Sequence, residues 1–146
     1  MAERKANAIW EGNLTEGKGT ILSVGSGAIG NLPITWAART ESSDGKTSPE
    51  ELIAAAHAAC FAMASSNELD KAGYPPERVN VTAICTADRV DGKFTILSVD
   101  LQAAAKVPNI NRAEFDRVME IAKGGCPVSR SLGGDVEIRL TAHLED

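Results

Sequence analysis

Hydrophobic and polar residues alternate in several runs along the chain, and this period of two predicts β-strands with one buried face. The runs cover residues 6–11, 20–24, 34–39, 79–90, 94–106 and 136–142. Glycine-rich turns separate the first three runs, and Asp91-Gly92, a dipeptide typical of tight hairpins, joins the fourth run to the fifth. The pattern therefore predicts antiparallel strands in two groups, one on each side of a central segment.

A long helix is predicted between the two groups of strands, over residues 49–71. Ser48 can cap its first turn, Glu51 can complete a capping box, and Gly73 can end it. Residues 53–64 are apolar on almost every side, which is typical of a helix that is buried all round. A chain of this length has few layers with which to surround such a helix, so we expect a partner subunit to supply part of the cover.

A second, shorter helix is expected to begin after Asn111, which can cap it, and to end at Gly124-Gly125. Cys126-Pro127 then has the pattern of a fresh helical turn with Cys126 at its cap. Together these elements predict an α+β fold, in which antiparallel strands flank one long buried helix and a shorter one.

Length and composition indicate one globular domain that covers residues 1–146. With 43% hydrophobic and 24% charged residues, the chain can build a core and lacks the composition of a disordered protein. Its net charge of −5 and its aromatic content of 4% argue against a nucleic-acid partner. The most apolar stretch, residues 52–63, is shorter than the about 20 residues that span a bilayer. Because no apolar segment typical of a secretion signal follows Met1, and because the number of cysteines is odd, we expect a cytoplasmic protein.

Cysteines are the main candidates for chemistry. Cys126 stands where the free N–H groups of a helix start would favour its thiolate, the nucleophilic form, although a small apolar residue at a turn is an equally good interpretation. Cys60 lies in the middle of the long helix among alanines, where burial should raise its pKa, and by itself it is best interpreted as a core cysteine. Cys85, in an alternating strand, is expected to fill the core. In a cytoplasmic chain, the pair on helices fits a reversible disulfide better than a permanent crosslink.

Polar residues near the long helix have structural interpretations as well as functional ones. Arg39 closes the strand before the polar loop, Glu50 lies in the first helical turn, and His57 lies one turn before Cys60. The simplest explanations are solvation for Arg39, helix capping for Glu50 and a hydrogen bond in the core for His57. His57, Cys60 and Cys126 could in principle form a three-ligand zinc site with an open position, but the chain has no Cys-x-x-Cys pair to strengthen that hypothesis.

Two segments closely resemble the motifs of the OsmC/Ohr family of thiol peroxidases. They are residues 48–64, SPEELIAAAHAACFAMA, and residues 122–129, AKGGCPVS. Residues 8–12 and 17–20 look like the first strands of the family, so the similarity covers nearly the whole chain. Arg39 is placed as in the OsmC branch. The Ohr branch carries its arginine earlier, and in that region this chain offers only Lys18.

The resemblance implies an OsmC-like fold, with sheets wrapped around central helices in an intertwined homodimer. It implies a peroxidase that reduces organic hydroperoxides, and hydrogen peroxide less well or variably, in oxidative and osmotic stress defence. Cys60 would be the peroxidatic residue and Cys126 the resolving one. This assignment reverses the order of reactivity that the positions of the two cysteines in their helices favour. A guanidinium from Arg39, held by Glu50, would lower the pKa of Cys60.

In the cycle that the resemblance implies, Cys60 becomes a sulfenic acid and then forms a disulfide with Cys126. An external dithiol restores both thiols, and no metal, haem or flavin takes part. The alternative is a non-enzymatic protein of the same fold that binds an apolar ligand in the space left by the alanines around Cys60. In that case the cysteines are inert, and Cys60→Ser leaves peroxide consumption unchanged.

Overall fold

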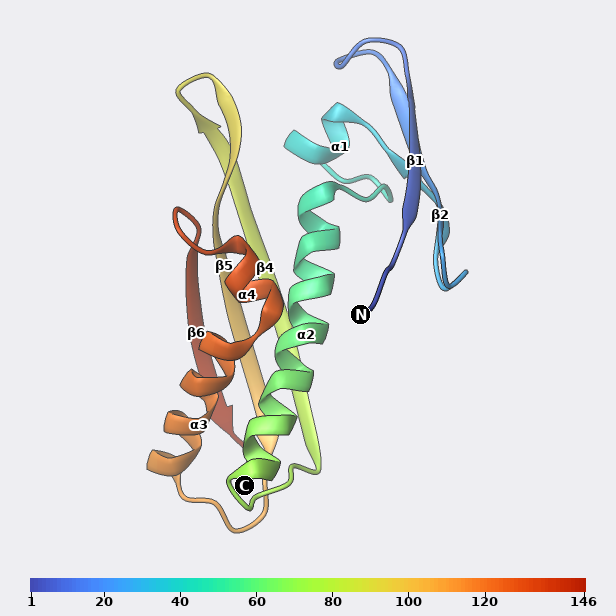
Figure 1. Ribbon diagram of the computed structural model, residues 1–146. Coiled ribbons are helices and arrows are strands. Elements are labelled where there is room, and N and C mark those ends of the chain that lie inside the picture. Colours follow the sequence, from blue (N-terminus) through green and yellow to red (C-terminus); the bar gives the residue numbers. More distant parts are fainter. The chain divides into compact units, whose positions relative to one another are not determined.

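The helices and strands fall into two units, Met1–Leu52 and Ile53–Asp146, in a computed structural model that describes all residues, 1–146 (Figure 1). The strands are β1 (Ala6–Glu11), β2 (Lys18–Val24), β3 (Gly30–Ile34), β4 (Arg78–Val90), β5 (Lys93–Lys106) and β6 (Glu137–Leu144). The helices are α1 (Trp36–Thr40), α2 (Pro49–Lys71), α3 (Arg112–Gly125) and α4 (Pro127–Leu132). None of these helices has both the length and the apolar character needed to cross a membrane.

The first unit is built on a three-stranded antiparallel sheet in the order β1-β2-β3. Its strands approach closely at Gly19, which lies opposite Trp10 on one side and Ile34 on the other. A Cβ at this position would come within 2.6 Å of the Trp10 ring, so the sheet needs glycine here. No hydrophobic residue of this unit is buried, and its exposed large side chains include Ile9, Trp10, Leu14, Leu22 and Ile29. A small sheet without a buried apolar face is not stable by itself and needs cover.

Residues 34–39, predicted as a strand, are instead divided between the end of β3 and the helix α1. Thr35 caps α1, because its Oγ1 accepts a hydrogen bond from the backbone N–H of Ala38 at 3.0 Å. A run of six residues is too short for alternation to distinguish a strand from a helical turn, and the cap decides between them. Arg39 therefore lies in the last turn of a helix, not at a strand end.

Helix α2 begins and ends where the sequence predicts. Ser48 Oγ accepts a hydrogen bond from the backbone N–H of Glu51 at 3.1 Å. The predicted capping box is only half formed, because the Glu51 carboxylate accepts a hydrogen bond from the Thr47 hydroxyl at 2.9 Å. The helix ends at Lys71, and Gly73 takes the positive φ of 91° that a helix terminus of this kind requires.

In the single chain, α2 is buried on one face and not all round. The buried side chains recur every four residues, at His57, Phe61, Ser65 and Leu69. The other side carries exposed alanines and Met63, whose exposed fraction is 68%. The apolar character of this helix therefore exceeds what one chain covers, and the predicted all-round burial requires cover from outside the chain.

The second unit contains a three-stranded sheet in the order β4-β5-β6, with helices on one face (Figure 1). Strands β4 and β5 form the predicted hairpin, and Asp91 and Gly92 take φ values of 51° and 78°, as a type I′ turn requires. Strand β6 pairs with β5 in parallel, whereas the sequence pattern predicts antiparallel strands only. The crossover through α3 and α4 returns the chain to the end at which β5 starts, so β6 runs in the same direction as β5.

The hydrophobic core lies in the second unit, between the sheet and its helices. Its side chains with no exposed area are Phe61, Leu69, Val99, Leu101, Ala105, Phe115, Met119, Ala122 and Cys126. Helix α3 begins as predicted, since the Asn111 side chain accepts a hydrogen bond from the backbone N–H of Glu114 at 2.9 Å. Because Cys126 joins α3 to α4 and is part of this core, packing fixes the position of its thiol.

Candidate active site

Arg39 and Glu50 form an ion pair in the first unit. The Arg39 Nε lies 3.0 and 3.1 Å from the two oxygens of the Glu50 carboxylate, and its Nη2 lies 2.8 Å from Oε1. The Glu50 side chain is 10% exposed and that of Arg39 is 32% exposed. The guanidinium also lies 5.8 Å from the centroid of the Trp36 ring, within the range of a cation–π contact. These contacts fix the orientation of the guanidinium and leave part of it open to solvent.

Cys60 and Cys126 both lie in the second unit, close enough for each thiol to shift the pKa of the other. Cys60 belongs to the middle of α2, and Cys126 is the residue before the first turn of α4. Burial raises the pKa of the Cys60 thiol, the backbone N–H of Val128 opposes that rise, and the neighbouring Cys126 sulfur adds to it. Within this unit Cys60 is therefore protonated at neutral pH.

Cys126 is the more acidic of the two thiols. Burial acts to raise the pKa of Cys126, but the backbone N–H and the hydroxyl of Ser129, the Cys60 thiol and the backbone N–H of Val128 lower it overall. Hydrogen bonds from N–H groups to a charged sulfur are stronger than those to a neutral one, so the start of α4 favours the thiolate. The order of the two pKa values is the one that their places in the helices predict.

His57 is fully buried, and its Nε2 lies 2.6 Å from the Oγ of Ser129. Burial lowers the pKa of His57, so the ring is neutral at pH 7. Its other nitrogen, Nδ1, is buried with no hydrogen-bond partner. Ser129 also lowers the pKa of Cys126, so the side chains that influence one another run from His57 through Ser129 and Cys126 to Cys60.

Ser129 was not among the predicted site residues. The spacing Cys-Pro-Val-Ser could have indicated it, because the third residue after a helix cap directs its backbone N–H, and often its side chain, toward the cap residue. The role of His57 in this contact depends on how α2 packs against α4, which local sequence does not specify.

Cys85 belongs to β4, where it lies opposite Val99 and packs against the hydrophobic core, as predicted. None of the three cysteines is in a disulfide. No group of three His, Cys, Asp or Glu side chains in the chain is arranged to hold a metal ion. The zinc site considered for His57, Cys60 and Cys126 is therefore not formed.

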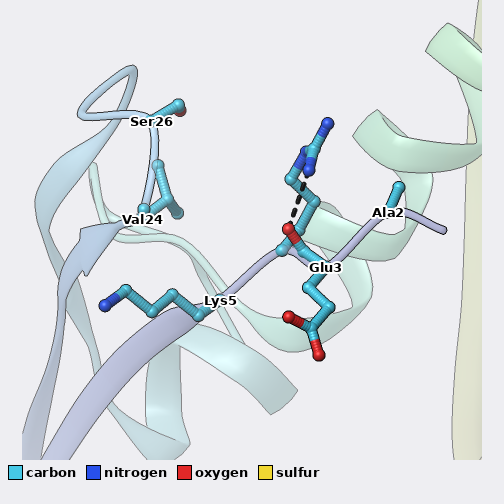
Figure 2. Close-up of a pocket in the computed structure, with 7 residues that line it drawn as sticks. Ala2, Glu3, Lys5, Val24 and Ser26 are labelled. Atoms are coloured by element: carbon cyan, nitrogen blue, oxygen red, sulfur yellow. Dashed lines mark hydrogen bonds between the residues drawn. The ribbon is translucent and has the colours of Figure 1, made fainter.

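A hollow of about 1060 Å³ in the first unit contains none of the predicted site residues (Figure 2). Its lining residues are Ala2, Glu3, Arg4, Lys5, Val24, Gly25 and Ser26. The Arg4 guanidinium donates a hydrogen bond to the backbone oxygen of Glu3 at 2.7 Å. Figure 2 shows the side chains of Glu3 and Lys5 pointing away from each other. With neither cysteine nor histidine in its lining, this hollow offers no match to the chemistry of the thiol pair.

The structure thus brings the four predicted catalytic residues together as two pairs, one in each unit. Two thiols in contact can be joined as a disulfide when two electrons and two protons are removed. A sulfenic acid on Cys60 would have the Cys126 thiolate next to it as a nucleophile. The Arg39–Glu50 pair supplies a cation of the type that lowers a thiol pKa.

Comparison with known proteins shows what the chain is similar to. Residues 42–141 match the family model described as OsmC-like protein. The chain is 42% identical over 135 residues to a protein named peroxiredoxin OsmC from Escherichia coli (strain K12), which covers 92% of this chain and 93% of that protein. It is 35% identical over 97 residues to an organic hydroperoxide resistance protein from Xanthomonas axonopodis, and the aligned region covers 65% of this chain and 66% of that protein. The crystal structure of an OsmC-like protein from Mycoplasma pneumoniae has the same fold, with a TM-score of 0.73, 15% identity and 99% of each chain covered.

Proposed function

This chain belongs to the OsmC-like family, and from that membership and the contact between Cys60 and Cys126 we propose that it reduces organic hydroperoxides as a cysteine-based peroxidase. The contact carries the proposal, because two thiols of unequal acidity side by side are what a peroxidatic and a resolving cysteine require. The names of the relatives, peroxiredoxin OsmC and organic hydroperoxide resistance protein, support the same class of reaction.

In the first step the Cys60 thiolate attacks the terminal oxygen of the hydroperoxide. The S–O bond forms as the O–O bond breaks, the sulfur is oxidised by two electrons, and the alkoxide that leaves takes up a proton to become an alcohol. Burial disfavours the Cys60 thiolate within its own unit, so this step needs a cation near the sulfur. We assign that role to Arg39, which is always charged and which Glu50 holds in a fixed orientation.

In the second step the Cys126 thiolate attacks the sulfur of the Cys60 sulfenic acid. The S–S bond forms, the S–O bond breaks, and the hydroxide that leaves becomes water when it takes up a proton. The acidity of Cys126 and its contact with Cys60 support this assignment. An external dithiol then reduces the disulfide by thiol exchange, so the proposed cycle uses no metal, haem or flavin.

The substrate we propose carries an alkyl substituent. Cys60 is flanked along α2 by Ala59 and Phe61, and alanines dominate the turns before and after it. These side chains are apolar and offer little polar interaction, so a charged hydroperoxide would be desolvated without compensation.

We also propose that the working form is a homodimer in the cytoplasm, with a role in oxidative and osmotic stress defence. Two observations support the dimer. The first unit has exposed apolar side chains and no buried ones, and α2 is apolar beyond the face that the chain itself covers. A second copy is the simplest source of cover for both.

Counting free thiols tests the cycle directly. Reduced protein is treated with one equivalent of tert-butyl or cumene hydroperoxide, and we expect the wild-type protein to lose two of its three thiols. Cys60→Ser should form no disulfide, and Cys85→Ser, the matched control, should still lose two thiols. Peptide mapping should join Cys60 to Cys126. If the wild-type protein loses no thiols and consumes no hydroperoxide, the chain is a binding protein of this fold and the proposal is wrong.

A further inference from the structure

The buried contact between His57 and Ser129 has no place in the two steps described above, although Ser129 lies one helical turn from Cys126 and lowers the pKa of that reacting thiol. His57 lies on α2, one turn before Cys60, and Ser129 lies in the first turn of α4, three residues after Cys126. The imidazole has no exposed area, and Ser129 is 7% exposed. A histidine that is fully buried, with one partnered nitrogen and one orphaned nitrogen, is a feature that core packing alone does not explain.

The orphaned nitrogen indicates which tautomer the ring adopts. A neutral imidazole carries its proton on one nitrogen and a lone pair on the other. A buried N–H without an acceptor is disfavoured more strongly than a buried lone pair without a donor. Because Nδ1 has no partner, the proton belongs on Nε2, and the Nε2–H donates to the Ser129 oxygen at 2.6 Å.

This tautomer determines where the Ser129 proton points. The Ser129 oxygen accepts from His57, so its own O–H is free to point toward Cys126, whose pKa this hydroxyl lowers. With the opposite tautomer, the hydroxyl would donate to the imidazole and the sulfur would lose this donor. The imidazole therefore acts on Cys126 only through the serine.

We propose that His57 is a positioning residue for the resolving step, which directs the Ser129 hydroxyl at Cys126 and so holds that sulfur as the thiolate that attacks the Cys60 sulfenic acid. This inference rests on the proposed function, because it assigns a role within that cycle. His57 stays neutral and Ser129 keeps its proton throughout. The thiol proton of Cys126 goes to solvent before the attack, and the hydroxide released from Cys60 takes a proton to become water.

The tautomer can be read in the intact protein by long-range proton–nitrogen NMR of the imidazole rings. The chain has two histidines, so His143→Gln leaves one signal set and assigns it to His57. We expect a protonated Nε2 and an unprotonated Nδ1 at neutral pH. A protonated Nδ1 would overturn the proposal whatever the behaviour of the variants.

The effect on Cys126 can be measured in a background with one thiol, Cys60→Ser with Cys85→Ser, which keeps a hydroxyl beside Cys126. Thiolate absorbance in the ultraviolet gives the titration midpoint without a reagent that has to enter the core. Ser129→Ala should raise that midpoint by about one pH unit, the effect of one hydrogen bond to a charged group. Ser129→Thr, which keeps the hydroxyl, should raise it less.

The decisive comparison uses His57→Leu, His57→Gln and the double variant that combines His57→Leu with Ser129→Ala. His57→Leu should raise the Cys126 midpoint about as much as Ser129→Ala, and the double variant should show no further rise, because both changes remove one donor. His57→Gln, whose amide can donate to Ser129, should restore part of the effect. An unchanged midpoint in folded His57→Leu, or shifts that add in the double variant, would contradict the proposal. If His57→Leu does not fold, the tautomer measurement and His57→Gln decide.

Neither measurement uses a peroxide, so this inference and the proposed function can fail separately. If the protein shows the expected tautomer and midpoints but consumes no hydroperoxide, the peroxidase cycle is disproved and the role of Ser129 as a donor to Cys126 stands. A protein that cycles normally with a protonated Nδ1 would disprove the role of His57 alone.

Discussion

Burial of His57 as a neutral ring makes the stability of the fold depend on pH. The pKa of His57 is lowered by burial, whereas the unfolded chain titrates near the ordinary value of 6.5. As the pH falls below that value, the unfolded state binds a proton that the folded state does not, so the free energy of unfolding decreases. The slope for one such proton is at most about 1.4 kcal/mol per pH unit, and the stabilisation is complete above the unfolded pKa.

Urea unfolding at about pH 7 and about pH 5 measures this effect. We expect the wild-type protein to lose stability over this range and His57→Gln to lose less, because glutamine does not titrate. The exposed His143 supplies the matched control, and His143→Gln should behave as the wild-type protein does. Equal losses in all three proteins would contradict this explanation.

The Arg39–Glu50 pair leads to a prediction about rate. Glu50→Gln keeps the shape of the side chain but removes the charge that holds the guanidinium at two oxygens. We expect hydroperoxide consumption to slow by roughly 10- to 100-fold in this variant, and more in Arg39→Ala, because a charged hydrogen-bonded pair contributes about 1.5–3 kcal/mol. The control is Arg117→Ala, which removes an exposed ion pair with Glu114 on α3. If neither Arg39→Ala nor Cys60→Ser slows turnover, the assignment of both residues is wrong.

The sequence motifs predicted which residues form the candidate site, but they predicted only some of the contacts between those residues. Cys60 and Cys126 could be named because their segments match a family, and the order of their acidities follows from mid-helix and helix-start positions. The hydrogen bond between His57 and Ser129 could not be predicted, because it joins residues far apart in the sequence. Only the packing of α2 against α4 brings their two polar atoms within 2.6 Å.

At the scale of elements, caps decide where helices begin, and the cap of α3 is the clearest case. The Asn111 side chain accepts a hydrogen bond from the backbone N–H of Glu114, and the helix places Phe115 in the core. Asn111→Ala should lower the free energy of unfolding by about 1 kcal/mol, whereas Asn111→Ser should change it little. Urea unfolding midpoints test this, and equal stability of the alanine variant and the wild-type protein would show that the cap contributes nothing.

Elements with strong local signals were predicted correctly, and those that depend on distant parts of the chain were not. The capping side chains of Ser48 and Asn111 and the Asp91-Gly92 turn act within a few residues, so the sequence identifies them. The direction of β6 depends on a crossover of two helices, and a local alternation carries no information about it. Burial of α2 is likewise a property of what surrounds it, not of its composition.

At the scale of the whole molecule, apolar surface remains uncovered in places that a single chain does not explain. Every buried hydrophobic residue lies between Phe61 and Cys126, so the first unit contributes none. A three-stranded sheet gains its stability from burial of an apolar face, and this one exposes both aromatic and aliphatic side chains. Association with a second copy would remove this surface from water, and it would also cover the apolar side of α2.

A charge placed on the uncovered side of α2 should therefore separate the subunits. Met63 is 68% exposed in the single chain, and in the proposed dimer it would be buried, so Met63→Glu would bring an unpaired carboxylate into an apolar interface. We expect sedimentation to show a dimer for the wild-type protein and a shift to monomer for this variant, with a lower unfolding midpoint that depends on protein concentration. Ile121 on α3 is the matched control, since it is 46% exposed but lies outside the proposed interface, and Ile121→Glu should remain a dimer. A monomeric wild-type protein would disprove the dimer, and the apolar side of α2 would then need a different partner to explain it.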